Sequence, residues 1–573
     1  MSEPVTLDRR KVIGALAGSA AAIAVVARGV PGNTGRGDPF ADHEGRAAAA
    51  RPADGGAYAN RDESYAATGG RVSAAKVQAP RLLFATASEA AAATRVTVPT
   101  ILATDDPALH LARRATFGPT RDLVDEIHTL GIDGWLAAQM DPAAIPDPVA
   151  DQVWGTFPLA SADPPTIRGA IGRYTWDAMS DYGLATIGRQ VWSRRQLFEV
   201  MVDFWANHLN VPTPGPGGWD VAVSYHNDVI RPHALGSFTD MLLGAGRHPA
   251  MLRYLNADQS TKESVNENMG RELLELHTVG VGSGYTEQDV RNSAYLLTGR
   301  TVVDEQGPGV EGTFTYDARK HWTGPVTVLD FVHDNATPEG GLDAGDAYLR
   351  HIAAHPATAQ TIARKLAVRM VSDMPPQELV DRLAATYLEN GTAIGPVLDV
   401  LFRSAEFWAA VGQKTRRPLE NVVASARVVG VRPGDDIGYG VAGLANRAHN
   451  AGHRPLAWPA PNGYPDVHAA WRSAGGMLAL WNNHRAVVGG WYDGLAFTEA
   501  KNLAAGMPTG TVGEYVDSLC QLLCFQLFHP PQRDALVGFL GGDPAMSSQR
   551  AGLDWKCHDL AALVLDSPYF TLR

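Results

Sequence analysis

From about residue 105 onward, apolar residues recur with a period of roughly 3.6, and nearly every such run ends at Gly or Pro. Residues 120–131 form one such run, with its apolar positions on one face. A later run begins with Thr286 and Asp289 at capping-box spacing and closes at Gly299. The pattern predicts a mainly α protein, a multi-helix globular array.

A short segment breaks this pattern. In residues 309–332, Thr, Val, Tyr and Phe alternate with polar residues, which is typical of a β-hairpin. We expect a small β insertion there, inside a helical domain that spans residues 105–573. The insertion separates two helical subregions, residues 105–300 and 350–573.

The N-terminus resembles an export signal. Arg9 and Arg10 precede an apolar stretch that ends near Ala27, as in the twin-arginine type of signal peptide, although Asp8 stands where Ser or Thr is usual. The stretch is shorter than the roughly 20 residues that span a bilayer, so a membrane anchor is the weaker alternative. We expect residues 1–27 to be a signal peptide, and the protein to be secreted or held in the cell envelope without a transmembrane span.

Residues 28–104 differ in composition from the rest of the chain. They are rich in Ala, Gly and Pro and contain few large apolar residues. Such a segment cannot bury enough apolar surface to offset its loss of conformational entropy. We therefore expect a disordered linker.

Composition excludes one class of function. The chain has 573 residues and a net charge of -12, and it contains no cluster of Lys and Arg. A protein that binds nucleic acid needs a broad basic surface to neutralise phosphates. Nucleic-acid binding is not expected.

The three cysteines do not indicate a disulfide framework. Cys520 and Cys524 are four positions apart in the apolar run "SLCQLLCFQLF", which favours a buried helix face. Buried Cys commonly packs as a small hydrophobic residue. Metal binding or redox chemistry that also involves Cys557 is the alternative.

The helix predicted in "NENMGRELLELHTVG", residues 266–280, carries a misplaced glutamate. At about 100° per residue, Glu272 falls inside the apolar stripe that Met269 and Leu273 define. Glu275 borders the same stripe, and His277 lies at its opposite border. The pattern predicts acidic and imidazole groups beside the core.

A second helix, in "RQLFEVMVDFWANHLNV", turns a histidine inward. His208 follows Leu197, Met201 and Phe204 at positions i+4, i+7 and i+11 of one face. Asn207 flanks that face, and the acidic residues of the segment point elsewhere. Because a buried charge or imidazole needs partners, we expect one polar cluster built from His208, Arg231, His233, Glu272, Glu275 and His277.

Three interpretations of this cluster stay open. It is a structural network of ion pairs and hydrogen bonds, or a general acid–base pair in which Glu272 polarises His208 for hydrolysis. The third interpretation is a divalent metal held by His and carboxylate ligands, although the chain has no HExxH motif. No G-x-S-x-G elbow, P-loop or dinucleotide fingerprint with the required context is present either.

The segment "LAWPAPNGYPDVHAAW" is the other candidate. Its prolines stiffen a loop that displays Trp458, Tyr464 and Asp466, and rigid aromatic loops often form ligand or sugar contacts. The alternative is a loop that its own aromatic residues fold over the core.

Several phrases together carry a resemblance to a known family. The most specific is "NENMGRELLELHTVGVGSGYTEQDV", and others are "FWANHLNV", "RRPLENVVASARVVG" and "WPAPNGYPD". From about residue 107 onward the chain resembles the bacterial family labelled domain of unknown function eighteen hundred. One departure is "KHWTGPV", where Trp322 follows His321 in place of the usual aspartate.

The resemblance implies a predominantly helical, exported protein. It also implies a partner, a co-exported protein of a family related to sulfatases and alkaline phosphatases, but no catalytic residues. Together with the cluster, it favours an extracytoplasmic hydrolase. The alternative is a non-catalytic binding or assembly protein that acts with that partner.

Overall fold

Helices dominate the first half of the folded chain. The computed structural model describes residues 105–307 and 309–573, so the predicted signal peptide and linker lie outside the described residues. Short 3₁₀ turns η3 (Pro142–Ala144), η4 (Pro158–Ser161) and η6 (Ala257–Gln259) connect the helices. The helices are α3 (Pro107–Ala115), α4 (Arg121–Met140), α5 (Pro148–Gly155), α6 (Pro164–Ala170), α7 (Asp177–Trp192), α8 (Gln196–His208), α9 (Ala222–Ser224), α10 (Arg231–His233), α11 (Phe238–Arg247), α12 (Pro249–Tyr254), α13 (Asn268–Glu272) and α14 (Glu287–Leu297).

Two segments of this half form π-helices, in which the hydrogen-bonded turn is one residue longer than in an α-helix. They are η5 (Tyr225–Ile230), which joins α9 to α10, and η7 (Leu273–His277), which continues α13. Turns of this kind often occur at functional sites.

The β structure consists of short antiparallel pairs. Strand β1 (Arg300–Val302) pairs with β2 (Phe314–Tyr316), and β3 (Val326–Val328) pairs with β4 (Phe331–His333). The 3₁₀ turn η8 (Ala318–Lys320) lies between the two pairs. The predicted β insertion is thus confirmed, but it contains two hairpins and starts earlier, at β1.

The second half is helical again and contains one more strand pair, β5 (Arg432–Pro433) with β6 (Leu495–Ala496). Two short 3₁₀ turns, η9 (His468–Trp471) and η10 (Ala500–Asn502), lie in its loops. The helices are α15 (Gly341–Ala353), α16 (Pro356–Met370), α17 (Gln377–Glu389), α18 (Ile394–Phe402), α19 (Ala405–Trp408), α20 (Pro418–Val429), α21 (Ile437–Asn450), α22 (Ala474–Val488), α23 (Val512–Cys524), α24 (Pro530–Phe539), α25 (Leu553–Leu565) and α26 (Pro568–Thr571).

Local sequence signals explain several helix ends. The Thr286 hydroxyl accepts a hydrogen bond from the Asp289 backbone, and the Asp289 carboxylate accepts one from the Thr286 backbone, so the predicted capping box of α14 is confirmed. Gly131, predicted as a helix end, lies inside α4 with a φ of 71° and kinks the helix there. The cap at Thr286 follows from a side chain that hydrogen-bonds free backbone groups, and the kink at Gly131 follows from the ease with which glycine adopts a positive φ.

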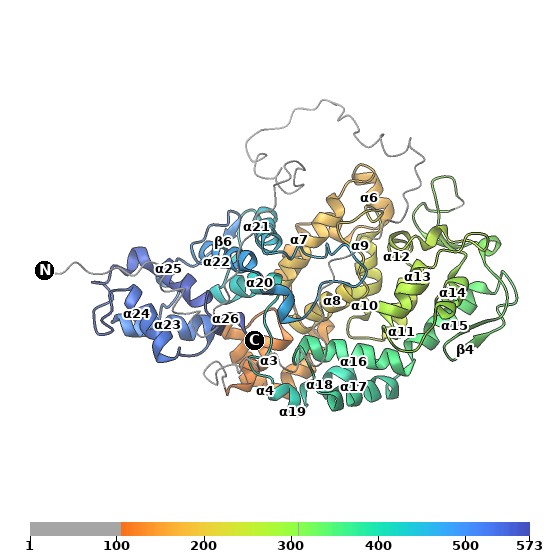
Figure 1. Cartoon of the computed structure of the whole chain (residues 1–573). Helices are drawn as coiled ribbons and strands as arrows, with labels where there is room; N and C mark the ends of the chain where they lie inside the picture. Colours follow the sequence, from red (N-terminus) through yellow and green to blue (C-terminus); the bar gives the residue numbers. More distant parts are fainter. Residues whose placement is uncertain (1–104, 308) are drawn as a thin grey trace, which may run out of the picture. The chain divides into compact units, whose positions relative to one another are not determined.

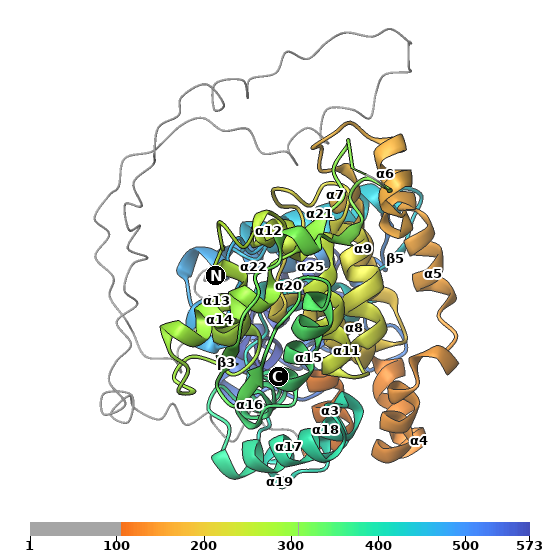
Figure 2. The ribbon, with the colours of Figure 1, turned by 90° about the vertical axis from the view of Figure 1, so that its right-hand side faces the viewer.

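The described residues belong to one compact unit with a continuous apolar core. Helices α16, α17 and α18 lie side by side in both ribbon views, and α20 packs against α7, α21 and α22 (Figure 1, Figure 2). Cys520, Cys524 and Cys557 are buried and form no disulfide within the described residues, as the core interpretation predicts. The mainly α fold class is confirmed, whereas the division into two helical subregions stays a prediction.

None of the described helices combines the length and the hydrophobicity that a membrane span requires.

Candidate functional site

Helix α8 is buried on every side. Its four predicted core positions, which end in His208, lie in the interior as expected. The acidic residues Glu199 and Asp203, expected to point elsewhere, are buried too, so that part of the prediction is wrong. A helix enclosed all round has no solvent face, and its charged side chains must be paired inside the protein.

Glu199 finds its partner in Arg231. The guanidinium group donates to both carboxylate oxygens, at 2.9 and 2.7 Å, and this charge raises the pKa of Arg231 although burial opposes it. Arg231 was expected to contact the histidines of the cluster, but it forms an ion pair with Glu199 instead. His233, two positions after Arg231 in α10, is partly exposed and forms no side-chain hydrogen bond or ion pair with the described residues.

His208 has partners for both ring nitrogens. Nε2 lies 3.0 Å from the carbonyl oxygen of His277, and Nδ1 lies 2.8 Å from Nζ of Lys365. A carbonyl only accepts, so Nε2 carries the proton and Nδ1 accepts a hydrogen bond from Lys365. Burial and the charge of Lys365 lower the pKa of His208 well below its usual value. The imidazole is therefore neutral.

Lys365, in the middle of α16, is the residue that sequence reasoning missed. Its Nζ also donates to the carbonyl oxygen of Leu276, at 3.0 Å, and its side chain is partly exposed. Burial lowers the pKa of its amine to about 8. The amine is thus poised to lose a proton near neutral pH, which an ordinary surface lysine is not.

The carbonyl groups that hold Lys365 and His208 come from a helix end. The last carbonyls of a helix have no partner within it, and those of Leu276 and His277 lie in the last turn of η7. Gly280, with a φ of 86°, turns the chain away, and its N–H closes back on the carbonyl of Leu274. The π-helix therefore presents two acceptors to α8 and α16.

His277 itself is buried beside His208. The two imidazole rings are 6.3 Å apart in an edge-to-face arrangement. Burial and the charge of Lys365 lower the pKa of His277 to about 3, so this ring is neutral as well. Its Nε2 is buried and has no hydrogen-bond partner among the described residues.

The prediction that Glu272 lies inside the apolar stripe of its helix is wrong. Glu272 is partly exposed, not inside the core stripe, whereas Leu274 and His277 are buried in place of Leu276. The longer π turn rotates every residue after Glu272 away from the α-helical projection. No described residue forms a hydrogen bond or ion pair with Glu272, and both ring nitrogens of His208 are already occupied by other groups.

Glu272 and Glu275 both lie on the partly exposed side of this segment. Burial, and then the charge of Glu275, raise the pKa of Glu272. Glu275 pairs with Arg271 at 3.6 Å. The six predicted cluster residues therefore do not form one cluster. His208 and His277 meet, Glu275 pairs with Arg271, and Arg231 pairs with Glu199, while Glu272 and His233 form no hydrogen bond or ion pair with the described residues.

The predicted aromatic loop lies on the end of α8. The side-chain amide of Asn207 donates to the carbonyl oxygen of Tyr464 at 2.8 Å, and the Tyr464 N–H donates back to the amide oxygen at 2.6 Å. Asn210 donates to the carbonyl oxygens of Trp458 and Ala460. Two regions that the sequence analysis treated separately thus come together.

The aromatic side chains of this loop pack within the protein. Tyr464 is buried, its hydroxyl donates to the carbonyl oxygen of Arg454, and its ring lies 4.8 Å from that of Trp458. His453 and Trp471 stack beside Tyr464. These contacts support the packing interpretation of the loop, with Trp458 partly exposed at its edge.

The close approach of this loop to α8 depends on Gly463. Its φ is 68°, and a Cβ there would run into the carbonyl oxygen of Asn207. We expect Gly463→Ala to lower the free energy of unfolding by about 1–3 kcal/mol, measured by urea denaturation. Gly452→Ala is the matched control, because Gly452 also has a positive φ but no atom within 4 Å of such a Cβ. Equal losses in both variants would contradict the steric role of Gly463.

Asp466, at the end of the loop, enters a buried network of charges. Its carboxylate lies 3.3 Å from Lys414 and 3.5 Å from Arg369. Burial raises its pKa, but these cations outweigh burial and lower the pKa of Asp466 to about 2. Arg369 is one turn along α16 from Lys365, so the network and the Lys365–His208 pair share a helix.

The network continues to α8 and α20. Arg417 donates to Asp203 and to Glu420, and Arg369 donates to Glu420. Despite burial, the surrounding cations hold the pKa of Glu420 well below its usual range. Every one of these side chains is nearly inaccessible to solvent, which is the arrangement that the structural interpretation of a polar cluster predicts.

In the described part of the chain, no three His, Cys, Asp or Glu side chains are grouped so that they could hold a metal ion.

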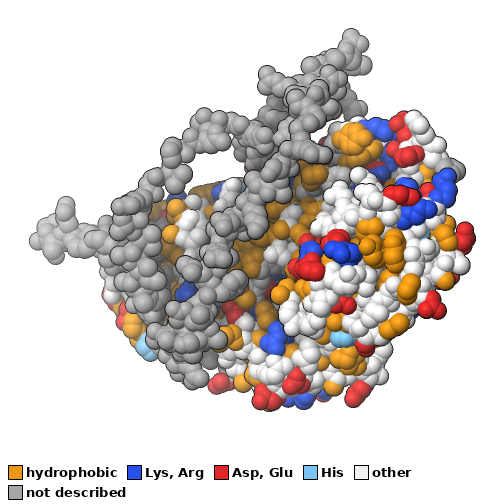
Figure 3. Space-filling model, turned by 45° about the vertical axis from the view of Figure 1, so that its right-hand side comes forward, with side chains coloured by type: hydrophobic (Ala, Val, Ile, Leu, Met, Phe, Trp, Pro, Cys, Tyr) orange, Lys and Arg blue, Asp and Glu red, His pale blue; other side chains and the backbone are white. Residues whose placement is uncertain are grey.

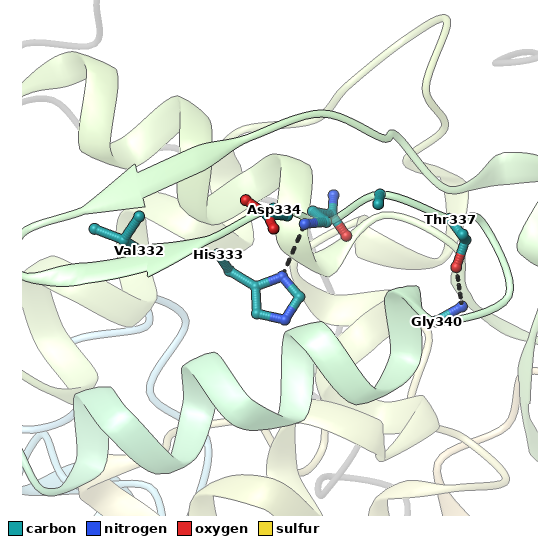
Figure 4. Close-up of a pocket in the computed structure, with 7 residues that line it drawn as sticks. Val332, His333, Asp334, Thr337 and Gly340 are labelled. Carbon is teal, nitrogen blue, oxygen red and sulfur yellow. Dashed lines mark hydrogen bonds between the residues drawn. The ribbon is translucent and has the colours of Figure 1, made fainter.

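A separate cavity of about 450 Å³ lies at the end of β4 (Figure 4). Two of its polar groups are engaged locally: Nδ1 of His333 accepts from the Asn335 N–H, and the Thr337 hydroxyl accepts from the Gly340 N–H. Trp322, in the "KHWTGPV" segment that departs from the family pattern, stacks on Tyr295 with ring centroids 4.2 Å apart. The cavity therefore offers less chemistry than the Lys365–His208 pair.

The surface carries charges of both signs. On the face shown in Figure 3, basic and acidic side chains alternate over the described residues without a broad basic area. The mixture of signs on this face accompanies the net charge of -12 of the whole chain.

Comparison with known proteins gives a family and nothing more specific. The model of the family described as Protein of unknown function (DUF1800) matches residues 110–572. No curated protein and no solved structure matches.

Proposed function

This chain belongs to the DUF1800 family of proteins of unknown function, and we propose that it is an exported hydrolase in which the amine of Lys365 acts as general base. The observation that carries the proposal is the 2.8 Å contact between Nζ of Lys365 and Nδ1 of His208, with the pKa of the amine lowered to about 8. A general base works best when its pKa lies near the operating pH.

The hydrogen bonds of Lys365 orient the amine. A neutral amine has two N–H groups, and the two acceptors His208 Nδ1 and Leu276 O take both of them. The lone pair is then the only part of the nitrogen left for another group. The Lys365 side chain is partly exposed, and the proposal requires water and substrate to reach its amine from that side.

The proposed step transfers a proton from water to Lys365. As an O–H bond of water breaks, Nζ takes the proton and the oxygen forms a bond to the carbonyl carbon of an ester or amide. The ammonium group then returns the proton to the departing oxygen or nitrogen, so the enzyme ends as it began. His208 stays neutral throughout and positions the amine.

Export is supported by the paired Arg9 and Arg10 and the apolar stretch that follows them. A co-exported partner related to sulfatases and alkaline phosphatases, which the family resemblance implies, belongs to the same proposal.

A second candidate function is a non-catalytic binding or assembly protein. The buried ion pairs around Glu420 and the loop fixed on Asn207 favour it, because both features hold helices in place. In that case Lys365 and His208 are part of the same structural network.

The pH dependence of hydrolysis tests the proposal. A panel of chromogenic carboxylic esters, amides, phosphate esters and sulfate esters is offered to the full chain between pH 6 and 10. We expect kcat/KM for an acyl substrate to fall by about tenfold per pH unit below a pKa of about 8 and to level off above it, because only the neutral amine accepts a proton. A profile without an inflection between pH 7 and 9 would argue against Lys365 as the base.

A further inference from the structure

A second cavity lies far along the chain from Lys365, where the end of α22 meets α25. Its volume is about 360 Å³. Helix α22 ends at a glycine pair, Gly489 and Gly490, and the chain returns to the cavity at Phe497. Helix α25 closes the other side with Cys557 and His558. The proposed hydrolysis uses none of these residues.

Trp491 forms an exposed aromatic wall of this cavity. Its side chain is 55% exposed, which is unusual for the largest apolar side chain. The Arg485 guanidinium lies 5.2 Å from the ring centroid, and Arg485 is itself held by Asp559 at 2.9 Å. A Cβ on Gly489 would lie 2.8 Å from the indole nitrogen, so only glycine allows the ring to lie there. The indole is therefore held in place while it faces solvent.

A second exposed indole follows on α25. Trp555 is 66% exposed, and a Cβ on Gly552 would lie 2.7 Å from its indole nitrogen. Trp555 precedes His558 by three positions, so the two share one face of α25. The His558 ring lies 6.3 Å from that of Trp491. Trp491 lines the cavity, and Trp555 lies one turn before the lining residue His558 on α25.

The polar groups of the cavity are mixed in sign. Glu499 and Lys501 form an ion pair at 3.0 Å and are both exposed, and Thr498 also lines the cavity. A carboxylate accepts hydrogen bonds, an ammonium group donates them, and an imidazole does both. The site therefore offers donors and acceptors beside a flat aromatic surface.

An exposed indole beside hydrogen-bond donors and acceptors favours some classes of ligand over others. A pyranose ring presents C–H groups on its face, which pack on an indole, and hydroxyl groups on its edge, which both donate and accept. Nucleic acid would require an excess of cations, and an apolar ligand would remove water from the exposed Glu499–Lys501 ion pair without offering it hydrogen bonds. A sugar can both pack on the Trp491 ring and form hydrogen bonds with the polar groups of the cavity.

We infer that this cavity binds a pyranose unit of an extracellular polysaccharide, with Trp491 as the stacking platform. The inference goes beyond the proposed hydrolysis, since it assigns the chain a separate surface that anchors it to carbohydrate.

Co-sedimentation tests the inference. The full chain is mixed with insoluble cellulose, chitin, starch granules and peptidoglycan sacculi, and the bound fraction is measured over a range of polysaccharide concentrations. We expect retention on at least one of the four, and a loss of affinity of at least tenfold in Trp491→Ala, because the stacking surface is removed. Trp491→Phe keeps an aromatic ring and is expected to retain part of the binding.

Two controls make the result specific. Trp176→Ala removes an exposed indole elsewhere, 39% exposed, and is expected to bind as wild type. Lys365→Met is expected to bind as wild type too, so failure of the hydrolase proposal leaves this test unaffected. Absence of retention on all four polysaccharides, or equal retention of wild type and Trp491→Ala, would overturn the inference.

Discussion

Lys365→Met is expected to lower kcat/KM for hydrolysis by about 10²–10⁴-fold, the range that a positioned general base contributes. Methionine has nearly the same length but cannot accept a proton. His208 and the Leu276 carbonyl lose a donor, yet both remain in place because α8 and η7 are packed independently of Lys365. The measurement is made on the best substrate of the panel, above the pKa of about 8, with circular dichroism to show that the variant folds.

Two further variants separate a base from a structural cation. Lys365→Arg keeps the positive charge and the capacity to donate to His208, but arginine does not lose its proton in proteins, so we expect it to be as inactive as Lys365→Met. Lys262→Met removes an exposed lysine that lies 3.9 Å from Glu263 and is expected to leave activity unchanged. An active Lys365→Arg would show that charge alone matters, and would favour the assembly interpretation.

Much of the fold could be predicted because helix ends are coded locally. The Thr286 and Asp289 pair caps α14 as expected, and the alternating residues near 309–332 do form strands. The position of Gly131 was also informative, although the helix bends there instead of ending. Local rules do not specify whether the chain continues in a helix beyond such a break.

Burial of the charged face of α8 could not be predicted from the same rules. A period of roughly 3.6 residues identifies one apolar face, and it found His208. Whether the opposite face meets solvent depends on which helices pack around it. Glu199 and Asp203 are buried because Arg231 and Arg417, distant in sequence, lie against them.

The signal for Lys365 is present in the sequence. Thr358, Ile362, Lys365 and Arg369 stand at i, i+4, i+7 and i+11, the same spacing that identified His208, and the other three are buried. The spacing alone does not identify the partner. His208 lies 157 positions away, and nothing local in either helix encodes that contact.

The π turn after Glu272 is the main reason that the predicted cluster failed. A projection at about 100° per residue assumes an unbroken α-helix, and one longer turn shifts all later residues. His277 thereby becomes buried and Leu276 partly exposed. The two carbonyls that hold Lys365 and His208 exist because of this same turn.

The second large effect is expected in the buried charge network. Arg417→Met should lower the free energy of unfolding by about 3–5 kcal/mol, since it leaves Asp203 and Glu420 buried with fewer partners. The surface pair of Arg382 and Glu406, at 2.8 Å, is the matched control. Arg382→Met should cost about 1 kcal/mol or less, because solvent screens that pair. Urea denaturation at pH 7 measures both losses.

The same network predicts how the loss of unfolding free energy in Arg417→Met depends on pH. Burial raises the carboxyl pKa values, but the cations outweigh it, so that of Glu420 lies well below its usual range and that of Asp466 is about 2. A depressed carboxyl pKa stabilises the fold above the pKa of the unfolded chain, about 4, and this contribution is lost as pH falls toward 2. The difference between wild type and Arg417→Met should therefore shrink from pH 5 downward. A difference that stays constant to pH 3 would mean that Arg417 stabilises the fold by packing and not by its charge.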